Sequence, residues 1–349
     1  MKKVVKQVLG IDVAQKELVV SLGRMYEDWT PELYAGKVFA NTEKGFASLL
    51  KWVNERTDQA VSLQFVMEAT GIYHEAFAYF LDGQQQDVSI VLPNKMSNYM
   101  RTLETKTITD KTASEAIARF GLERKLDNWH KPKELYRMLQ QLTRERDQLV
   151  LERTVLKNQL HAEEAGAFPL VGSITRLKER IILINKQEKL IKQEIEVLIE
   201  KDPQVKQILE LICTIPGISI LTAAIILGET NGFELIRNKR QLASYAGFDV
   251  KEKESGTSVK KKAKISKKGN RHLRKAMHFP ALSAIKHDER FKAIFARLVA
   301  RDGIKMKAAV AVQRKLLEMT YTIYKTNKKY DKCYLKQEKE NALVVVEQK

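Results

Sequence analysis

The sequence predicts an α/β domain at the N-terminus, a coiled-coil middle and a mainly α-helical C-terminal part. Three observations support this division. Short apolar segments separated by turn residues fill the first third, apolar residues then recur at heptad spacing, and amphipathic helical patterns with a basic excess follow. At 349 residues and 44% hydrophobic content, the chain is long and apolar enough for two or three domains with cores of their own.

The N-terminal segments, residues 1–130, are expected to form a mixed sheet. Strands come first as a meander and then alternate with helices, which is the order of an α/β domain. Helices are expected after Asn41 or Thr42, over 76–81, and from Asp110 to about Gly121 behind the N-cap Thr109. The expected strands are residues 4–12, 17–23, 37–40, 62–67 and 88–92.

Residues 131–205 have the repeat of a coiled coil. Leucine recurs every seven residues from Leu135 to Leu156, and a second run from Ile174 to Leu198 has 3–4 spacing that only Glu188 breaks. The two helices could pair as an antiparallel hairpin within one chain, or with a second subunit. The length of the second helix favours dimerisation, so this region is predicted to be a dimerisation region.

The positive charge of the chain is concentrated in its C-terminal part. The whole chain has a net charge of +18, and residues 206–349 hold 31 basic residues against 14 acidic ones, a net charge of +17. This segregation favours a polyanionic partner such as nucleic acid over a surface that is basic only for solubility. We expect a helical basic domain over 206–327 and a polar tail over 328–349.

Composition also excludes several classes of protein. The two cysteines, Cys213 and Cys333, exclude a disulfide scaffold and a four-cysteine zinc site, and they fit a reducing cytoplasm. The N-terminus lacks the apolar segment of a signal peptide. The uncharged stretch from Leu211 to Gly228 contains Pro216-Gly217, which favours a buried helix–turn–helix over a membrane span. This turn is similar to the hairpin of helix–hairpin–helix DNA binders, although an ordinary αα turn explains it equally well.

Three acids lie at the ends of predicted elements. Asp12 ends the first strand, Glu68 follows the fourth strand, and Asp110 begins a helix after the fifth. If the first and fourth strands are neighbours, the three carboxylates converge. Clustered carboxylates repel one another, so such a cluster normally holds Mg²⁺ or Mn²⁺. A single acid at a strand end is usually a cap or a surface group, and only the combination predicts a metal site.

Several motifs occur in an order that identifies a family. The motifs are Gly10–Ala14 with Lys16, Met67–Tyr73, Ile215–Ile218, Leu242–Phe248, Glu254–Gly256 and Lys268–Arg274. In this order they resemble the DEDD transposases of insertion-sequence family 110, which include the pilin-gene-inverting recombinases, and the resemblance runs from about residue 4 to 325.

The resemblance implies an RNase H/RuvC-like N-terminal domain with four acids in the order Asp, Glu, Asp, Asp. The first three match Asp12, Glu68 and Asp110, which would bind Mg²⁺ or Mn²⁺. Ala113 stands at the place of the fourth acid. Glu115 is a poor substitute, because at roughly 100° per residue it lies about 140° around a helix from Asp110.

The resemblance also implies a reaction and its partners. Ser255, in the Ser-Gly pair, would attack a DNA phosphodiester and form a phosphoserine link, allowing strand exchange. The DNA would be chosen by a structured guide RNA, and the protein would act as a dimer or tetramer in the bacterial cytoplasm, at the nucleoid and away from membranes. Without the resemblance, Ser255 would rate only as a loop serine.

The surroundings of Ser255 are strongly basic. Residues 251–275 contain 11 lysine or arginine residues and two glutamates. We expect a lysine-rich loop that becomes ordered on nucleic acid, the alternative being a disordered linker. His272 could exchange a proton with a phosphate, but a packing or hydrogen-bond role is the simpler interpretation. The predicted nucleic-acid-binding residues are Lys253, Lys260, Lys261, Lys262, Lys267, Lys268, Arg271 and Arg274.

The sequence and the resemblance together predict a DNA transposase or site-specific recombinase that uses metal-assisted serine attack. One alternative is a RuvC-like metal-dependent nuclease in which water is the nucleophile and Ser255 is structural. The other is a catalytically degenerate scaffold that binds nucleic acid without reacting, which Ala113 suggests.

Overall fold

The computed structural model describes residues 2–69, 71–103, 107, 109–234, 236–255 and 259–331, with the backbone alone at residues 94, 252–255 and 259–263. The chain divides into two compact units, Met1–Lys131 and Pro132–Lys349. Each unit has a hydrophobic core of its own, so each is described by itself. Most of the predicted tail over 328–349, including Cys333, lies outside the described residues.

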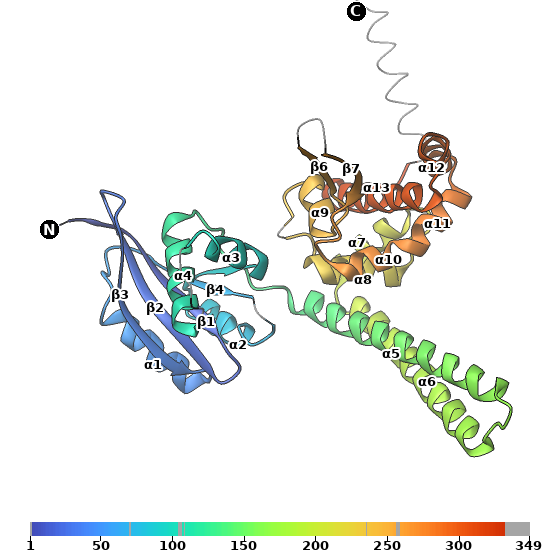
Figure 1. Cartoon of the computed structure of the whole chain (residues 1–349), viewed down its shortest axis with the longest axis horizontal. Coiled ribbons are helices and arrows are strands. Elements are labelled where there is room, and N and C mark those ends of the chain that lie inside the picture. The colour runs from blue at the N-terminus through green and yellow to red at the C-terminus, as the bar shows by residue number, and fades with distance from the viewer. Residues whose placement is uncertain are drawn as a thin grey trace, which may run out of the picture. The chain divides into compact units, whose positions relative to one another are not determined.

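The first unit is built on a five-stranded mixed sheet in the order β3-β2-β1-β4-β5 (Figure 1). β1 pairs antiparallel with β2 and parallel with β4, so it is the central strand. The expected meander followed by alternating strands and helices is confirmed. The strands are β1 (Val4–Val13), β2 (Glu17–Tyr26), β3 (Pro31–Ala40), β4 (Leu63–Glu68) and β5 (Asp87–Val91).

Helices cover both faces of this sheet. One core forms where Phe46 and Phe77 of α1 and α2 pack on Leu9 of β1, and a second where Ile117 of α4 packs on Val8 from the opposite face. The sheet therefore has a helical layer on each face, as expected of an α/β domain. The helices are α1 (Glu43–Asn54), α2 (Glu75–Gly83), α3 (Pro93–Met100) and α4 (Asp110–Glu123).

α4 lies unusually close to β1. A Cβ atom added at Gly10 would overlap the backbone of Ser114 and Ala118, so only glycine permits this approach. At the other end of α4, the Lys6 ammonium donates hydrogen bonds to the carbonyl oxygens of Gly121 and Leu122. These contacts fix the position of α4 along β1.

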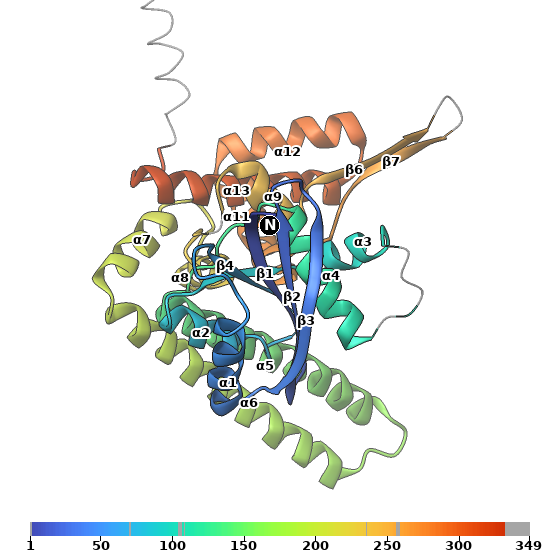
Figure 2. The ribbon, with the colours of Figure 1, turned by 90° about the vertical axis from the view of Figure 1, so that its left-hand side faces the viewer.

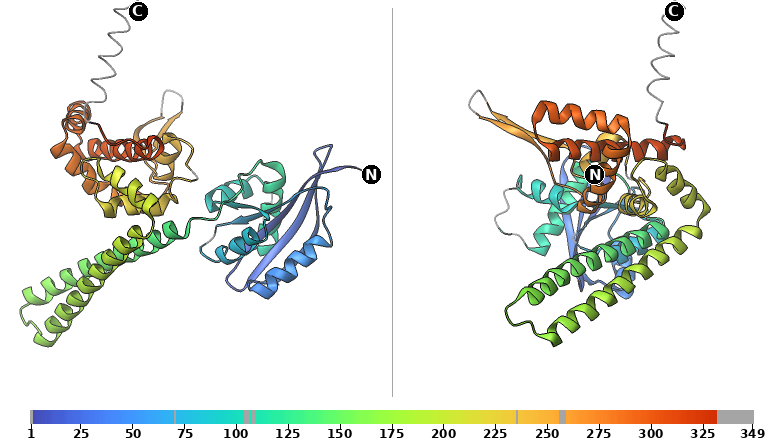
Figure 3. Two further views of the ribbon diagram at one scale, coloured as in Figure 1. Left: turned by 180° about the vertical axis from the view of Figure 1, so that it is seen from behind. Right: turned by 90° about the vertical axis from the view of Figure 1, so that its right-hand side faces the viewer.

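The second unit begins with two long helices, α5 (Glu134–Ala165) and α6 (Val171–Glu200), which run side by side in opposite directions (Figure 3). We call them the α5–α6 hairpin. Leu156 of α5 packs against Leu177 and Ile184 of α6 in the same chain. Of the two pairings that the heptad pattern allowed, the antiparallel one within a single chain is therefore present.

Glu188, the one acid in the apolar stripe of α6, is paired across the α5–α6 hairpin. Its carboxylate accepts hydrogen bonds from Arg146 at 3.0 Å and from Arg153 of α5, and Lys192 lies 3.1 Å away on α6 itself. A buried charge is tolerated when opposite charges surround it, so Glu188 fits a position that is otherwise apolar.

The remaining helices pack with the first turns of α5 and the last turns of α6 into one core. The stretch from Leu211 to Gly228 comprises the end of α7, a turn and most of α8, which confirms the predicted helix–turn–helix. Within the described ranges, no helix combines the length and apolar character needed to cross a membrane. These helices are α7 (Pro203–Cys213), α8 (Ile220–Thr230), α9 (Lys239–Tyr245), α10 (Arg271–Ala276), α11 (His278–His287), α12 (Glu289–Asp302) and α13 (Lys305–Thr326).

The lysine-rich segment does not form the loop expected from its composition. β6 (Val250–Ser255) and β7 (Val259–Ile265) pair antiparallel in a two-stranded sheet, which projects from the helices of its unit (Figure 2). We call it the β6–β7 ribbon. The lysine content hid these strands, because the β-branched residues that favour a strand, such as Val250 and Ile265, stand mainly near its ends.

Candidate active site

Asp12 lies near the end of the central strand of the first unit. Ile11 and Val13 on either side of it are buried, whereas Asp12 itself is half-buried. Successive side chains of a strand point to opposite faces of the sheet. Asp12 therefore lies on the same face as Gly10, which is the face that α4 covers.

Glu68 is the last residue of β4, the parallel neighbour of β1. The register pairs Ile11 with Met67, so Asp12 and Glu68 each follow this pair by one residue. Paired positions of parallel strands point to the same face, so the two acids lie on adjacent strands under α4. The pairing of the first and fourth strands, on which the sequence argument depended, is confirmed.

Asp110 comes to the same place on the first turn of α4. Gly121 approaches Val8, and Ser114 approaches Gly10, so α4 runs opposite to β1 and its N-terminus lies toward Asp12. Thr109 caps the helix by accepting from the backbone N–H of Thr112 at 3.2 Å. The positive end of the helix dipole also favours a carboxylate at this position.

Charge repulsion at this site is visible in the ionisation of Asp12. Burial, together with the carboxylates of Asp110 and Glu68, raises the pKa of Asp12 from 3.8 to about 6. The two neighbours act through their negative charge, so the three acids lie near one another. The structure brings together the three residues that the sequence grouped.

These acids have the chemistry that a hard divalent cation requires. Carboxylate oxygens are the ligands that Mg²⁺ and Mn²⁺ prefer, and a cation would relieve the repulsion that raises the pKa of Asp12. Among the described residues, no three acidic, histidine or cysteine side chains are close enough to chelate one ion as they stand. Mg²⁺ usually keeps several water ligands, so one or two of these carboxylates would suffice to hold it.

The place of the fourth acid is apolar. Ala113 lies half-buried on the first turns of α4, and Glu115 is also half-buried two residues further on. The acids that raise the pKa of Asp12 are Asp110 and Glu68, and Glu115 is not among them. In the described structure the acid cluster thus consists of three carboxylates.

A cleft of about 650 Å³ opens beside Glu68, between α3 and α4. Arg101 supplies a positive charge, and Ser97 and Thr112 supply hydroxyl groups. Arginine and hydroxyl side chains are groups that often contact phosphates in complexes with nucleic acids. The sequence does not single out Arg101, because it belongs to no motif. The other lining residues are Pro93, Met100, Leu103 and Ala116.

Ser255 is the last residue of β6 and is paired in register with Val259. It therefore lies at the outer end of the β6–β7 ribbon rather than in an irregular loop. Its side chain is outside the described part of the structure, as are Gly256, Thr257 and Ser258 entirely. The side chains of Lys253, Lys260, Lys261 and Lys262 are likewise not described, and their backbone belongs to the β6–β7 ribbon.

The other predicted contacts of nucleic acid lie at the base of this ribbon. Lys267, Lys268 and Arg271 are exposed. Arg274 has a structural role, because its Nη1 donates to the carbonyl oxygens of Ala246 at 2.7 Å and Gly269 at 3.1 Å.

His272 lies on α10 at the base of the β6–β7 ribbon. Its Nδ1 is 3.6 Å from the Asp147 carboxylate of α5. The simpler interpretation of His272, as a group that contacts other protein residues, agrees with this position.

Comparison with known proteins identifies the family. A profile described as "Transposase IS116/IS110/IS902 family" matches residues 209–296, and a transposase profile for the DEDD proteins of IS110 elements matches residues 9–169. The pilin gene-inverting proteins of Moraxella lacunata and Moraxella bovis are each 28% identical to this chain, over 94% of it and 98% of their own length.

Among solved structures, RuvC of T. thermophilus in complex with a Holliday junction substrate is similar to this chain. The two are 12% identical with a TM-score of 0.26, over 33% of this chain and 97% of RuvC. The two family profiles match separate segments of the chain, and the Moraxella relatives align along nearly all of it. The chain therefore belongs to the IS110 family of transposases, enzymes that cleave and transfer DNA strands.

Proposed function

We propose that this chain moves or inverts a DNA segment by serine attack assisted by a divalent metal ion. The observation that carries the proposal is the convergence of Asp12, Glu68 and Asp110 on one face of the sheet. Burial, together with the charges of Asp110 and Glu68, raises the pKa of Asp12 to about 6. In the proposed scheme, these acids of the first unit and Ser255 of the second act on the same phosphodiester, within one subunit or across a dimer or tetramer.

The acids of the first unit hold the charge that the reaction requires. A Mg²⁺ or Mn²⁺ ion bound by them would stabilise the negative charge that develops on the phosphate. Asp12 is half-buried near the end of β1 and is the acid that the central strand of the sheet supplies. Asp110 is exposed on α4, and Arg101 of the adjoining cleft binds the phosphate that flanks the reacting one.

The serine supplies the nucleophile. The Ser255 Oγ attacks the phosphorus, the bond from phosphorus to a sugar oxygen breaks, and that oxygen takes up the proton that the serine releases. One strand end is then joined to Ser255 as a phosphoserine ester. A hydroxyl of a second strand reverses the step on a new partner, so exchange requires no ATP.

A structured RNA that pairs with both DNA partners would choose the sites. A protein that reads RNA mainly by shape needs a broad basic surface, and the net charge of +17 over residues 206–349 is consistent with this requirement. This role places the protein in the cytoplasm, at the nucleoid.

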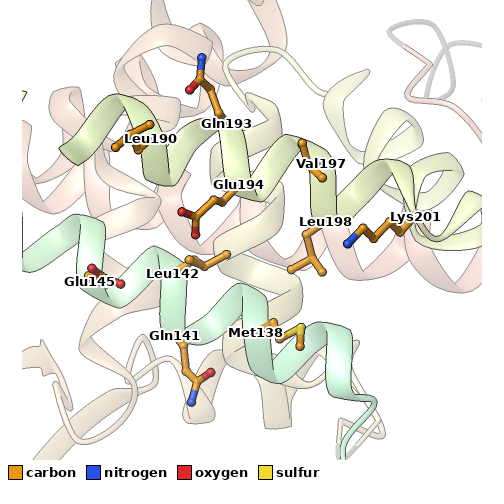
Figure 4. Close-up of a pocket in the computed structure, with 10 residues that line it drawn as sticks. All are labelled: Met138, Gln141, Leu142, Glu145, Leu190, Gln193, Glu194, Val197, Leu198 and Lys201. Carbon is orange, nitrogen blue, oxygen red and sulfur yellow. The ribbon is translucent and has the colours of Figure 1, made fainter. Parts of the chain in front are cut away.

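A second copy of the chain has a suitable surface on the α5–α6 hairpin. Leu183, Leu190 and Val197 recur every seven residues on α6 and are 54%, 47% and 56% exposed. Leu190 and Val197 also line a groove of about 750 Å³ between the two helices, with Met138 and Leu142 on the α5 side (Figure 4). This second apolar stripe supports a homo-oligomer.

Covalent trapping tests the serine chemistry. Element-junction DNA with an end label is incubated with the protein and the RNA that flanks the element, and the mixture is denatured. We expect label on the wild-type protein and on Ser258→Ala, a matched change three residues further along the sequence, but not on Ser255→Ala. If Ser255→Ala cleaves DNA as fast as the wild-type protein without joining strands, water is the nucleophile and the chain is a metal-dependent nuclease.

Metal binding distinguishes an active recombinase or nuclease from an inactive scaffold. Calorimetry with Mg²⁺ or Mn²⁺ on the nucleic-acid complex is expected to show binding that Asp12→Asn abolishes. Absence of any binding heat would favour the scaffold that Ala113 suggests. DNA binding itself should weaken at least tenfold between low and moderate salt, roughly as counterion release by several phosphate contacts requires.

A further inference from the structure

A fully buried carboxylate lies beneath the β6–β7 ribbon. The Glu229 side chain of α8 has no exposed surface. It accepts hydrogen bonds from the Arg144 Nε at 2.7 Å, the Arg144 Nη2 at 2.9 Å and the Asn270 Nδ2 at 2.5 Å. Burial works against ionisation, but the hydrogen bonds from Arg144 and Asn270 outweigh it and lower the pKa of Glu229. The carboxylate is therefore charged and held by two other elements.

Asn270 connects the Glu229 carboxylate to α10, which follows it, and to the segment that precedes β6. Its Oδ1 caps α10 by accepting from the N–H groups of His272 at 2.9 Å and Leu273 at 3.1 Å. Its own backbone N–H donates to the carbonyl oxygen of Tyr245 at 2.7 Å. One side chain thus joins the start of α10 to Glu229, while its backbone joins the segment that leads into β6.

Hydrogen bonds continue without a break from the β6–β7 ribbon down to Asn270. Below the last ladder pair, the N–H of Ser266 donates to Asp249 at 2.7 Å and that of Lys267 donates to Gly247 at 3.1 Å. The Ser266 hydroxyl also bonds the Asp249 carboxylate at 2.5 Å. The ribbon therefore has a fixed base, and the base ends at Asn270.

We propose that Glu229 is a positioning residue that sets the direction of the serine-bearing ribbon through Asn270. A two-stranded ribbon is only marginally stable alone, so its direction depends on its base. This inference deepens the proposed function and depends on it only for the role of Ser255. Neither residue touches DNA in this role.

The α5–α6 hairpin is tied to the same point. Arg144, which holds Glu229, belongs to α5, and one helical turn away Asp147 lies 3.2 Å from Lys275 of α10. α5 therefore forms one ion pair with Glu229 and one with α10, the helix that Asn270 caps.

Exchanging the two functional groups tests the proposal. Asn270→Asp keeps the helix cap, since aspartate caps as well as asparagine, but places a second carboxylate against Glu229. We expect amide hydrogen exchange over 250–255 and 259–265 of the full chain to become about tenfold faster. In Glu229→Gln/Asn270→Asp an amide faces a carboxylate again, and the exchange rate should return to within about twofold of wild type.

Two controls separate positioning from general loss of folding. Asn238→Asp changes an exposed N-cap of α9, whose Oδ1 accepts from the N–H of Gln241 at 2.9 Å, and should leave exchange in the ribbon unchanged. Asn270→Ser keeps a cap and adds no charge, so it should lie between wild type and Asn270→Asp. Unchanged exchange in Asn270→Asp, or no recovery in the double variant, would overturn the proposal.

Activity provides the second readout. The yield of covalent adduct on end-labelled DNA should fall about tenfold in Asn270→Asp and recover in the double variant, as hydrogen exchange does. Binding of Mg²⁺ by the acids of the first unit, measured by calorimetry, should stay at the wild-type level. If wild type forms no adduct at all, serine attack is wrong, while hydrogen exchange still decides whether Glu229 positions the ribbon.

Discussion

Asp12 in the first unit lies beside two other acids, whereas Glu188 in the second unit is surrounded by arginine and lysine. Burial and neighbouring carboxylates raise the pKa of Asp12 to about 6. Burial acts on Glu188 in the same direction, but hydrogen bonds from Lys192, Arg153 and Arg146 outweigh it and lower its pKa to about 2. Glu188 is a carboxylate that the fold has already paired with positive charges, so its role is structural. Asp12 lies among like charges, so it marks a candidate cation site.

The largest expected effect is on catalysis. Asp12→Asn keeps the size of the side chain and removes the charge that holds the cation, so DNA cleavage with Mg²⁺ should fall about a thousandfold, or about 4 kcal/mol in activation free energy. Initial nicking rates on end-labelled DNA measure it. Asp28→Asn, which changes an exposed acid paired with Lys2, should cleave at the wild-type rate. Equal loss in both variants would mean that Asp12 has no special role.

The next effect concerns the approach of α4 to β1. Gly10→Ala should lower the free energy of unfolding of the first unit by about 3 kcal/mol, because the added methyl group overlaps the backbone of α4. Gly83→Ala at the end of α2 meets no atom within 4 Å and should be neutral or slightly stabilising. Denaturation followed by tryptophan fluorescence reports on this unit alone, since Trp29, Trp52 and Trp129 all belong to it.

A smaller loss is expected when the paired carboxylate is removed. Glu188→Ala should destabilise the α5–α6 hairpin by about 2 kcal/mol, because Arg146 and Arg153 lose their partner. Glu188→Leu restores the apolar stripe and should cost less. Hydrogen exchange over 134–200 measures both, and equal exchange in Glu188→Ala and wild type would show that the pairing contributes nothing.

The smallest effect is on how the stability of the fold depends on pH. Asp12 and Glu188 contribute to this dependence with opposite signs. The folded pKa of Asp12 is raised, so its contribution to stability is fully present below about pH 4 and lost as pH rises through about 6, by about 1 kcal/mol after screening by solvent. The folded pKa of Glu188 is lowered, so its contribution is present above its ordinary value and lost as pH falls toward about 2.

Metal-free protein in chelator allows these slopes to be compared. Tryptophan fluorescence follows the first unit, and hydrogen exchange follows the α5–α6 hairpin. In Asp12→Asn the dependence of the first unit on pH between 4 and 7 should become flatter. A slope that Asp12→Asn leaves unchanged would assign the effect to another group.

The acid cluster could be predicted because strand ends are marked in the sequence. Asp12 interrupts the apolar segment near the end of β1, Glu68 ends β4, and a cap marks the helix start before Asp110. The first half of β3, Pro31 to Gly36, was not predicted, since an edge strand that is only half-buried lacks the apolar pattern of a central strand.

The base of the ribbon could not be predicted. Glu229 stands at the end of an apolar helix, where a sequence shows a charge but not the distant Arg144 and Asn270 that satisfy it. The signal available was the unusual acid in a buried segment, because such residues are seldom buried without partners. Strand pairing across 250–265 was hidden by lysine for a similar reason.

The anchoring of α4 has a consequence for how this site tolerates change. Lys6 holds one end of the helix, and Asp110 stands at the other. Inserting one residue between Asp110 and Gly121 would rotate the acid by about 100° relative to its anchor and carry it off the sheet. The site therefore depends more on the length of this helix between those two points than on most of the side chains along it.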